Sequence, residues 1–365
     1  MAAPVTAQAQ SAHDALSRVI DDHWSWWLSV HPTDATARGV RDYDDAIYDL
    51  SLDGRAAQVK KEQGFVSRLE AIPAKELSPA DAVNRDVLLW ILRDDIAGEA
   101  HQAERLMLFT TYYGWHQGFA SMANGLPFYS RSDYESYLKR LSLYPKQNGD
   151  ALAITRRAIT GGYVQPCSVL QNYAASISGI VAGKPEETSF YEPFTRTRPR
   201  DIGETEWRLM QGRAIALIRD VLTPEYNKWH DLFVADYLPH CRQSDSASAL
   251  PGGANWYASR VRAHTTTDLT PEQIHAIGLA EVARISKRMD ETAVKAGYAT
   301  RAAFIAHLRS DPSYYAKTPE ELLRVAARQA KAIDGLLPRY FATLPRLPYG
   351  LRAIPMAEAE GTTTA

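Results

Sequence analysis

The chain has 365 residues, of which 45% are hydrophobic and 23% are charged, and this composition is typical of a globular protein rather than a disordered one. The formal net charge of -2 gives no general attraction to nucleic acid or to anionic lipid. No stretch reaches the roughly 20 apolar residues that a membrane-crossing helix needs, so we expect neither membrane insertion nor a nucleic-acid partner.

The first twelve residues are rich in alanine and other small side chains. They resemble the tail of a secretory signal peptide, without the basic and apolar regions that precede such a tail. An ordinary disordered N-terminus has the same composition. The sequence therefore predicts a periplasmic or secreted protein if residues 1–12 are a signal-peptide remnant, and otherwise a cytoplasmic one.

The following segments predict one helix after another. Residues 14–29 place an aromatic-rich apolar stripe on one face, and His23 on that stripe is expected to be a core histidine. The remaining helix starts are indicated by capping residues followed by Pro, Glu or an apolar period. These are Ser78 before a helix to about residue 100, Ser132 with Glu135, residues 204–236 with a break at Pro224, and Thr318 with Glu321.

Four segments are expected to be loops, at residues 110–128, 161–166, 183–201 and 243–253. The first holds an aromatic cluster at residues 112–116 that either lines a cleft or caps the helical core, and we prefer the second interpretation. The last ends in Gly252 and Gly253, which permit positive φ or a close backbone approach. We therefore regard Gly252, Gly253 and the nearby Tyr257 as candidate substrate-binding residues.

A further helix is expected from Pro271, with Thr270 as its N-cap. Its apolar stripe includes Glu281, and a carboxylate there needs an ion pair, a hydrogen bond or a proton. A structural ion pair is the simpler interpretation, and a catalytic acid is the alternative. His275 lies at the edge of the stripe and points away from Glu281, so the two are candidate substrate-binding groups but not a shared metal site.

The two cysteines, Cys167 and Cys241, have no metal-ligand spacing, so we expect no structural zinc. They can form a disulfide if the protein is exported, but we expect two separate buried thiols.

Four segments together resemble a bacterial family known as domain of unknown function 885, which is grouped with gluzincin-like zinc metallopeptidases. They are SDYESYLKRL from Ser132, GGYVQP from Gly161, LPGGANWY from Leu250 and TTTDLTP from Thr265, and together they span most of the chain. The resemblance implies a helix of the His-Glu-x-x-His type that binds zinc, with peptides as substrates. No pair of the ten histidines has this spacing.

We therefore predict a mostly α-helical, multi-helix scaffold that forms one wall of a cleft, with little β structure near the C-terminus. Residues 13–345 are expected to form the helical domain, and the proline-rich residues 346–365 an extended segment leading to a missing catalytic part. No catalytic residue, metal ligand or cofactor is predicted in this chain, and zinc is expected only in a longer form. The chain is then the inactive helical part of a zinc-dependent peptidase that contacts peptide substrate. The alternative is a non-enzymatic helical protein that binds a peptide or a partner.

Overall fold

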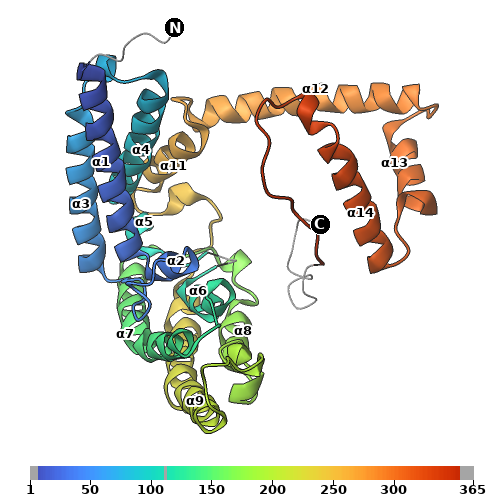
Figure 1. Ribbon diagram of the computed structural model, residues 1–365. Helices are drawn as coiled ribbons and strands as arrows, with labels where there is room; N and C mark the ends of the chain where they lie inside the picture. The colour runs from blue at the N-terminus through green and yellow to red at the C-terminus, as the bar shows by residue number, and fades with distance from the viewer. Residues whose placement is uncertain (1–6, 111–112, 354–365) are drawn as a thin grey trace. The chain divides into compact units, whose positions relative to one another are not determined.

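The computed structural model describes residues 7–110 and 113–353, which form two compact units, Met1–Thr270 and Pro271–Ala365. We call these unit 1 and unit 2, and each is described by itself. Their helices are coloured along the chain in Figure 1. The sequence predicted a helical domain over residues 13–345, and the helices within this range belong to both units, which divide at the start of the helix that follows Thr270.

Both units are helical, and the described residues contain no sheet, which confirms the predicted fold class. The only β pairings within them are isolated bridges between Phe109 and Gly114 and between Pro166 and Arg242. The expected β structure near the C-terminus does not form up to residue 353. Pro345 and Pro348 remove two backbone donors from that stretch. Ile354 and the rest of the segment lie outside the described residues.

The first three long helices of unit 1, α1 (Ala7–Val30), α3 (Leu52–Glu70) and α4 (Pro79–Gly98), lie side by side (Figure 1). Leu16 and Val19 of α1 pack with Phe65 of α3 and Leu92 of α4 in a separate core cluster. His23 lies on this face, half-buried, with its ring edge-on to Phe65, and burial lowers its pKa. The short helices α2 (Pro32–Ala37) and α5 (Gln102–Leu106) follow α1 and α4.

The larger core of unit 1 surrounds the long helix α7 (Arg131–Gly161). Around it pack α6, α9 and α10, with α8 against α10, and Tyr134, Tyr137 and Tyr144 of α7 are all fully buried. These helices span Trp115–Ala120, Tyr173–Ser178, Glu204–Leu217 and Thr223–Leu232, and α11 spans Gly253–Thr265.

The helix starts test the capping predictions one by one. Ser78 caps α4 and Thr318 caps α14 (Pro319–Asp334) as predicted, each accepting a hydrogen bond from a backbone N–H three residues on. The predicted start at Ser132 is wrong by two residues. Ser130 caps α7, and its partner in the capping box is Asp133, because the carboxylate of Asp133 accepts the Ser130 backbone N–H.

The break predicted at Pro224 is also present. The chain stays helical from Glu204 to Tyr237, but a wide π turn at Ile218–Leu222 separates α9 from α10. Proline cannot donate the helical hydrogen bond at its own position, and the wider turn accommodates it.

The two cysteines form a disulfide, so the expectation of two separate buried thiols is wrong. The backbone N–H of Cys167 donates to the Arg242 carbonyl at 2.9 Å, and the Arg242 N–H donates to the Gln165 carbonyl at 3.1 Å. These bonds hold the two segments side by side and bring the cysteine Cα atoms within 5.1 Å, inside the range that a disulfide can bridge.

Unit 2 contains α12 (Pro271–Lys295), α13 (Arg301–Ser310) and α14 (Pro319–Asp334). α12 and α13 contact each other. Among the described residues of this unit only Ala293 is buried. Unit 2 therefore has helices with a clear amphipathic pattern but almost no interior.

Candidate functional site

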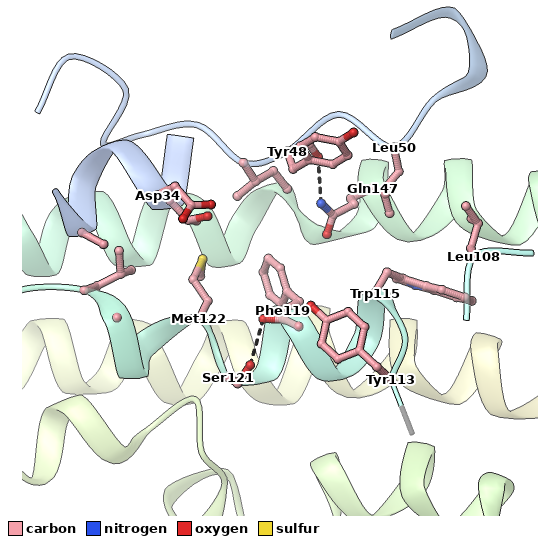
Figure 2. Close-up of a pocket in the computed structure, with 16 residues that line it drawn as sticks. Asp34, Tyr48, Leu50, Leu108, Tyr113, Trp115, Phe119, Ser121, Met122 and Gln147 are labelled. Atoms are coloured by element: carbon pink, nitrogen blue, oxygen red, sulfur yellow. Dashed lines mark hydrogen bonds between the residues drawn. The ribbon is translucent and has the colours of Figure 1, made fainter. Parts of the chain in front are cut away.

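Unit 1 has an open pocket of about 440 Å³ between α2, α6, α7 and the segment that joins α2 to α3 (Figure 2). Its walls are mainly aromatic and apolar, with a few polar groups among them. The described residues that line it are Thr33, Asp34, Ala37, Ile47, Tyr48, Leu50, Leu108, Tyr113, Trp115, Gly118, Phe119, Ser121, Met122, Gly125, Leu126 and Gln147. A mainly apolar cleft with a few placed polar groups is the usual form of a ligand site.

Arg140 of α7 fixes the α2 wall of the pocket. Its fully buried guanidinium donates to the carbonyl oxygens of Pro32, Tyr43 and Ala46 and to the hydroxyl of Thr36, at distances of 2.6–3.1 Å. Burial lowers the pKa of Arg140 to about 10, so the side chain remains charged at neutral pH. Four charge-assisted hydrogen bonds therefore hold residues 32–46 against α7.

The next part of the same wall is fixed by Gln147, about two turns further along α7. Its amide nitrogen donates to the Tyr48 carbonyl at 2.8 Å, a contact drawn in Figure 2. The Tyr48 ring and Leu50 then face the pocket with Ile47. Because the anchors on α7 bind the backbone, they place the segment whatever side chains it carries.

The opposite wall is α6, whose Trp115 and Phe119 point into the pocket (Figure 2). The indole N–H of Trp115 donates to the side-chain oxygen of Asn148 at 3.0 Å, and the Asn148 amide donates to Glu225. Trp115 also packs against Trp229, with ring centroids 4.5 Å apart. This residue therefore belongs both to the core and to the pocket.

Tyr113 lies over α6 because Gly118 leaves room for it. A Cβ at position 118 would lie 2.2 Å from the Tyr113 hydroxyl, a distance that no real contact shows. The Tyr113 ring is itself largely exposed at the pocket mouth. The aromatic cluster at residues 112–116 thus lines a cleft as well as capping the core, although the sequence favoured capping alone, and Tyr112 lies outside the described residues.

His116, next to Trp115, points away from the pocket and is fully buried. Its ring packs against Tyr173 and Trp229, and neither ring nitrogen has a hydrogen-bond partner among the described residues. Burial lowers the pKa of His116 to about 4. The imidazole is therefore neutral at physiological pH and acts as part of the core.

The pocket carries polar groups but no catalytic arrangement among its described lining residues. Asp34 is paired with Arg38 at 2.8 Å, and the hydroxyl of Ser121 donates to the Gly118 carbonyl at 3.3 Å. No histidine lines it, so Ser121 has no base there. Within the described ranges 7–110 and 113–353, no group of three His, Cys, Asp or Glu side chains is arranged to hold a metal ion.

The predicted substrate-binding residues lie elsewhere. Gly252 adopts a positive φ of 67° and caps α11, while Gly253 is buried, and a Cβ on it would lie 2.0 Å from the Ala247 carbonyl oxygen. Both glycines thus have structural roles, and Tyr257 is an exposed residue on the same helix. Their part in substrate binding stays a prediction.

His275 and Glu281 both belong to α12 in unit 2 and are exposed. Glu281 accepts hydrogen bonds from the Arg284 guanidinium, with a closest distance of 2.6 Å. This is the ion pair that the sequence analysis preferred, although the surrounding stripe is open to water rather than buried. The sequence did not single out the 440 Å³ pocket, since its walls come from segments more than 100 residues apart.

Comparison with known proteins connects this fold to a family. Residues 32–365 match the family described as bacterial protein of unknown function (DUF885). The chain belongs to this family. A search of curated proteins finds no match. The family part of the predicted resemblance is thus confirmed, and its zinc-peptidase part stays a prediction.

A solved structure described as "the putative lipoprotein from Colwellia psychrerythraea" has the same fold, with a TM-score of 0.81 at 17% sequence identity. The match covers 98% of this chain but 64% of that protein. The chain therefore spans less than two thirds of that relative. In the described part of the chain, no helix is both long enough and apolar enough to cross a membrane.

Proposed function

We propose that this chain is the peptide-binding helical part of a longer, exported peptidase-like protein, and that the unit 1 pocket holds an apolar side chain of the peptide. The observation that carries the proposal is the open pocket itself, with Tyr48, Tyr113, Trp115 and Phe119 in its walls. Aromatic side chains supply large, rigid apolar surfaces for a bound apolar group. The Asp34 carboxylate in the same lining pairs with Arg38 through one oxygen, and a peptide amine or a basic side chain would bind it in exchange for this pair or at its other oxygen.

Hydrolysis is assigned to a part of the longer protein that carries the zinc motif expected from the family resemblance. Activation of water near neutral pH is the chemistry that zinc supplies in such enzymes. The length of the solved relative supports a longer form, because 36% of that protein lies outside the match. Peptides are the substrate class that the same resemblance implies.

Export is supported by two independent observations. The Cys167–Cys241 disulfide is a bond that persists in oxidising compartments such as the periplasm and is rare in the cytosol. The solved relative with the same fold is described as a "putative lipoprotein". Blocking the free thiols of protein extracted from its native cells, followed by reduction and mass spectrometry, tests this part of the proposal. Two thiols that are labelled before reduction would contradict it.

The binding proposal is tested by titrating the purified chain with the tripeptides Ala-Phe-Ala and Ala-Ser-Ala in a calorimeter, once with a chelator and once with zinc. We expect Ala-Phe-Ala to bind more tightly than Ala-Ser-Ala, and equally well under both conditions. Tyr113→Ala removes one aromatic wall and should weaken Ala-Phe-Ala binding by roughly tenfold, since about 1.4 kcal/mol corresponds to that factor.

Tyr129→Ala is the matched control, because Tyr129 is also an exposed tyrosine but does not line the pocket. An equal loss of Ala-Phe-Ala affinity in Tyr113→Ala and Tyr129→Ala, or equal affinities of the chain for the two tripeptides, contradicts the proposal.

A non-enzymatic binding protein is the second candidate, and it is favoured by the fact that unit 1 alone supplies every described residue of the pocket. The coding sequence separates the two. A His-Glu-x-x-His helix in the same reading frame supports the peptidase, whereas its absence together with zinc-independent peptide binding supports the binding protein.

A further inference from the structure

The apolar sides of α12 and α14 in unit 2 are open to water. Ile285 of α12 is 46% exposed and Ile333 of α14 is 56% exposed, although both residues lie at the centre of an apolar stripe. Among residues 271–353 the single buried side chain is Ala293. Monomeric proteins rarely expose contiguous apolar patches larger than a few hundred Å².

Each stripe follows the helical repeat for several turns, so the exposed apolar surface extends along the helix rather than being limited to one residue. Steps of three or four residues connect the members. On α12 these are Ile274, Gly278, Val282, Ile285 and Met289, and on α14 and the turn that follows it they are Leu322, Ala326, Gln329, Ile333 and Leu336. We call these two rows the α12 stripe and the α14 stripe.

The energetic consequence is large for a unit of this size. Full burial of a Val, Leu, Ile or Met side chain stabilises the folded state relative to leaving that side chain exposed. Unit 2 forgoes a large part of this contribution at six exposed positions on the two stripes. Most of the stability of a helix in a protein comes from packing of its apolar face, so a partner surface on the two stripes should stabilise both helices.

The segment that follows α14 defines the charge of that partner. Residues 335–353 carry Arg339, Arg346 and Arg352 but no acidic residue, whereas Arg324, Arg328 and Lys331 lie on the side of α14 opposite the stripe. Tyr340 and Phe341 in the same stretch are exposed. A complementary surface is therefore an apolar ridge bordered by carboxylates.

We infer that the α12 and α14 stripes are the docking surface for a further folded segment of the same polypeptide, of the kind that forms the unmatched part of the solved relative. That relative holds the same fold within a chain of which 36% lies outside the match. A segment that completes a core is a better occupant than a second copy, because unit 2 lacks an interior of its own. The inference and the proposed function both rest on a longer protein, but the inference does not depend on the pocket in unit 1.

Hydrogen–deuterium exchange on two proteins tests the inference: the 365-residue chain and the product of the complete reading frame that contains it. In the 365-residue chain, the amides of α12 and α14 should exchange quickly, whereas those of α7 and α10 exchange slowly. In the longer product, the protection of α12 and α14 should rise by at least a hundredfold.

A pair of variants on one helix makes the test specific to the stripe. Ile285→Asp in the longer product should abolish the added protection of α12. Ala283→Asp introduces the same side chain two residues away on the opposite side, where the residue is also exposed, and should preserve it. Ile285→Ala is a milder variant that keeps the product folded, and it should lower the protection by about tenfold.

Several results would overturn the inference. One is a reading frame without a further folded segment. The others are equal exchange in the two proteins, protection of both stripes already in the 365-residue chain, or an equal loss of protection in Ala283→Asp and Ile285→Asp. Protection that rises with protein concentration would also overturn it, since it would identify a second copy as the occupant. Peptide titration reads only the pocket in unit 1, so failure of the proposed function and failure of this inference are distinguishable.

Discussion

Units 1 and 2 have helices with similar amphipathic patterns and opposite degrees of burial. α7 in unit 1 buries Tyr134, Tyr137 and Tyr144 completely, whereas α14 in unit 2 buries no residue. The pattern of a helix thus specifies which side can be buried, but another element must supply the surface that buries it. Unit 1 therefore has a pocket with all its walls in place, whereas unit 2 has apolar stripes that no element covers among the described residues.

The tryptophans make the comparison measurable. All eight lie in unit 1. Tryptophan fluorescence therefore reports the unfolding of unit 1 alone, while far-ultraviolet circular dichroism reports the helices of both units. Unfolding in urea should show one cooperative transition by fluorescence and, by circular dichroism, an additional earlier loss of helix from unit 2.

The largest expected effect is in the core of unit 1. Trp229→Ala removes a fully buried ring that packs against Phe109, Trp115 and Phe233, and it should lower the free energy of unfolding by about 3–5 kcal/mol. Trp24→Ala is the control, because Trp24 is 46% exposed and should change the free energy far less. Urea unfolding followed by fluorescence measures both, and similar losses would mean that the burial described for Trp229 is wrong.

The disulfide is the next largest contribution. Cys167 and Cys241 are 74 residues apart, and closing a loop of this length stabilises the folded state by roughly 2–4 kcal/mol. Cys167→Ser with Cys241→Ser should reduce the stability of unit 1 by about this amount. The early helix loss that circular dichroism assigns to unit 2 should not move, and a shift of that phase would show that the two units unfold together.

A smaller, pH-dependent effect comes from His116, whose pKa in the folded state is about 4. In the unfolded chain a histidine has a pKa of about 6.5. Between these values the unfolded state binds a proton that the folded state does not, so the stability falls as the pH is lowered from 6.5 toward 4. The loss is at most roughly 3 kcal/mol.

The measurement is urea unfolding of unit 1 at pH 7 and at pH 4.5. His116→Phe should remove this part of the pH dependence, whereas His264→Phe, at an exposed position, should retain it. An unchanged pH dependence in His116→Phe would show that the imidazole is accessible to protons in the folded state.

The smallest effect is expected in unit 2. Ile285→Ala in the 365-residue chain should change the stability by less than about 0.5 kcal/mol, because the side chain is already about half exposed. The same substitution at Ile177, which is fully buried in unit 1, should cost about 2–5 kcal/mol. Urea unfolding measures both variants, followed by circular dichroism for Ile285→Ala and by fluorescence for Ile177→Ala. A loss of unfolding free energy at Ile285 close to that at Ile177 would show that the α12 stripe is covered.

The helical fold could be predicted because helix starts depend on local signals. The caps at Ser78 and Thr318 and the break before Pro224 all depend on residues within one turn of each other. The start of α7 was misplaced because Ser130 with Asp133 and Ser132 with Glu135 have the same spacing, and only the structure shows which serine accepts the bond.

The site was harder to predict because its parts are distant in sequence. Arg140 bonds to backbone groups about 100 residues earlier, and the pairing of Cys167 with Cys241 depends on the bridge between Pro166 and Arg242. No local pattern contains either fact. The apolar period of α12 did predict a buried stripe around Glu281, but it could not indicate whether this structure supplies the surface to cover it.

The contacts of Arg140 also affect how the pocket can change over generations. Three of its four bonds are to carbonyl oxygens, which every amino acid carries. Side chains along residues 43–50 can therefore be exchanged without altering the path of the backbone that presents them. Relatives that keep this arginine are free to vary the shape of the pocket by substitution in that wall alone, and a library randomised at Ile47, Tyr48 and Leu50 should yield folded proteins with differently shaped pockets.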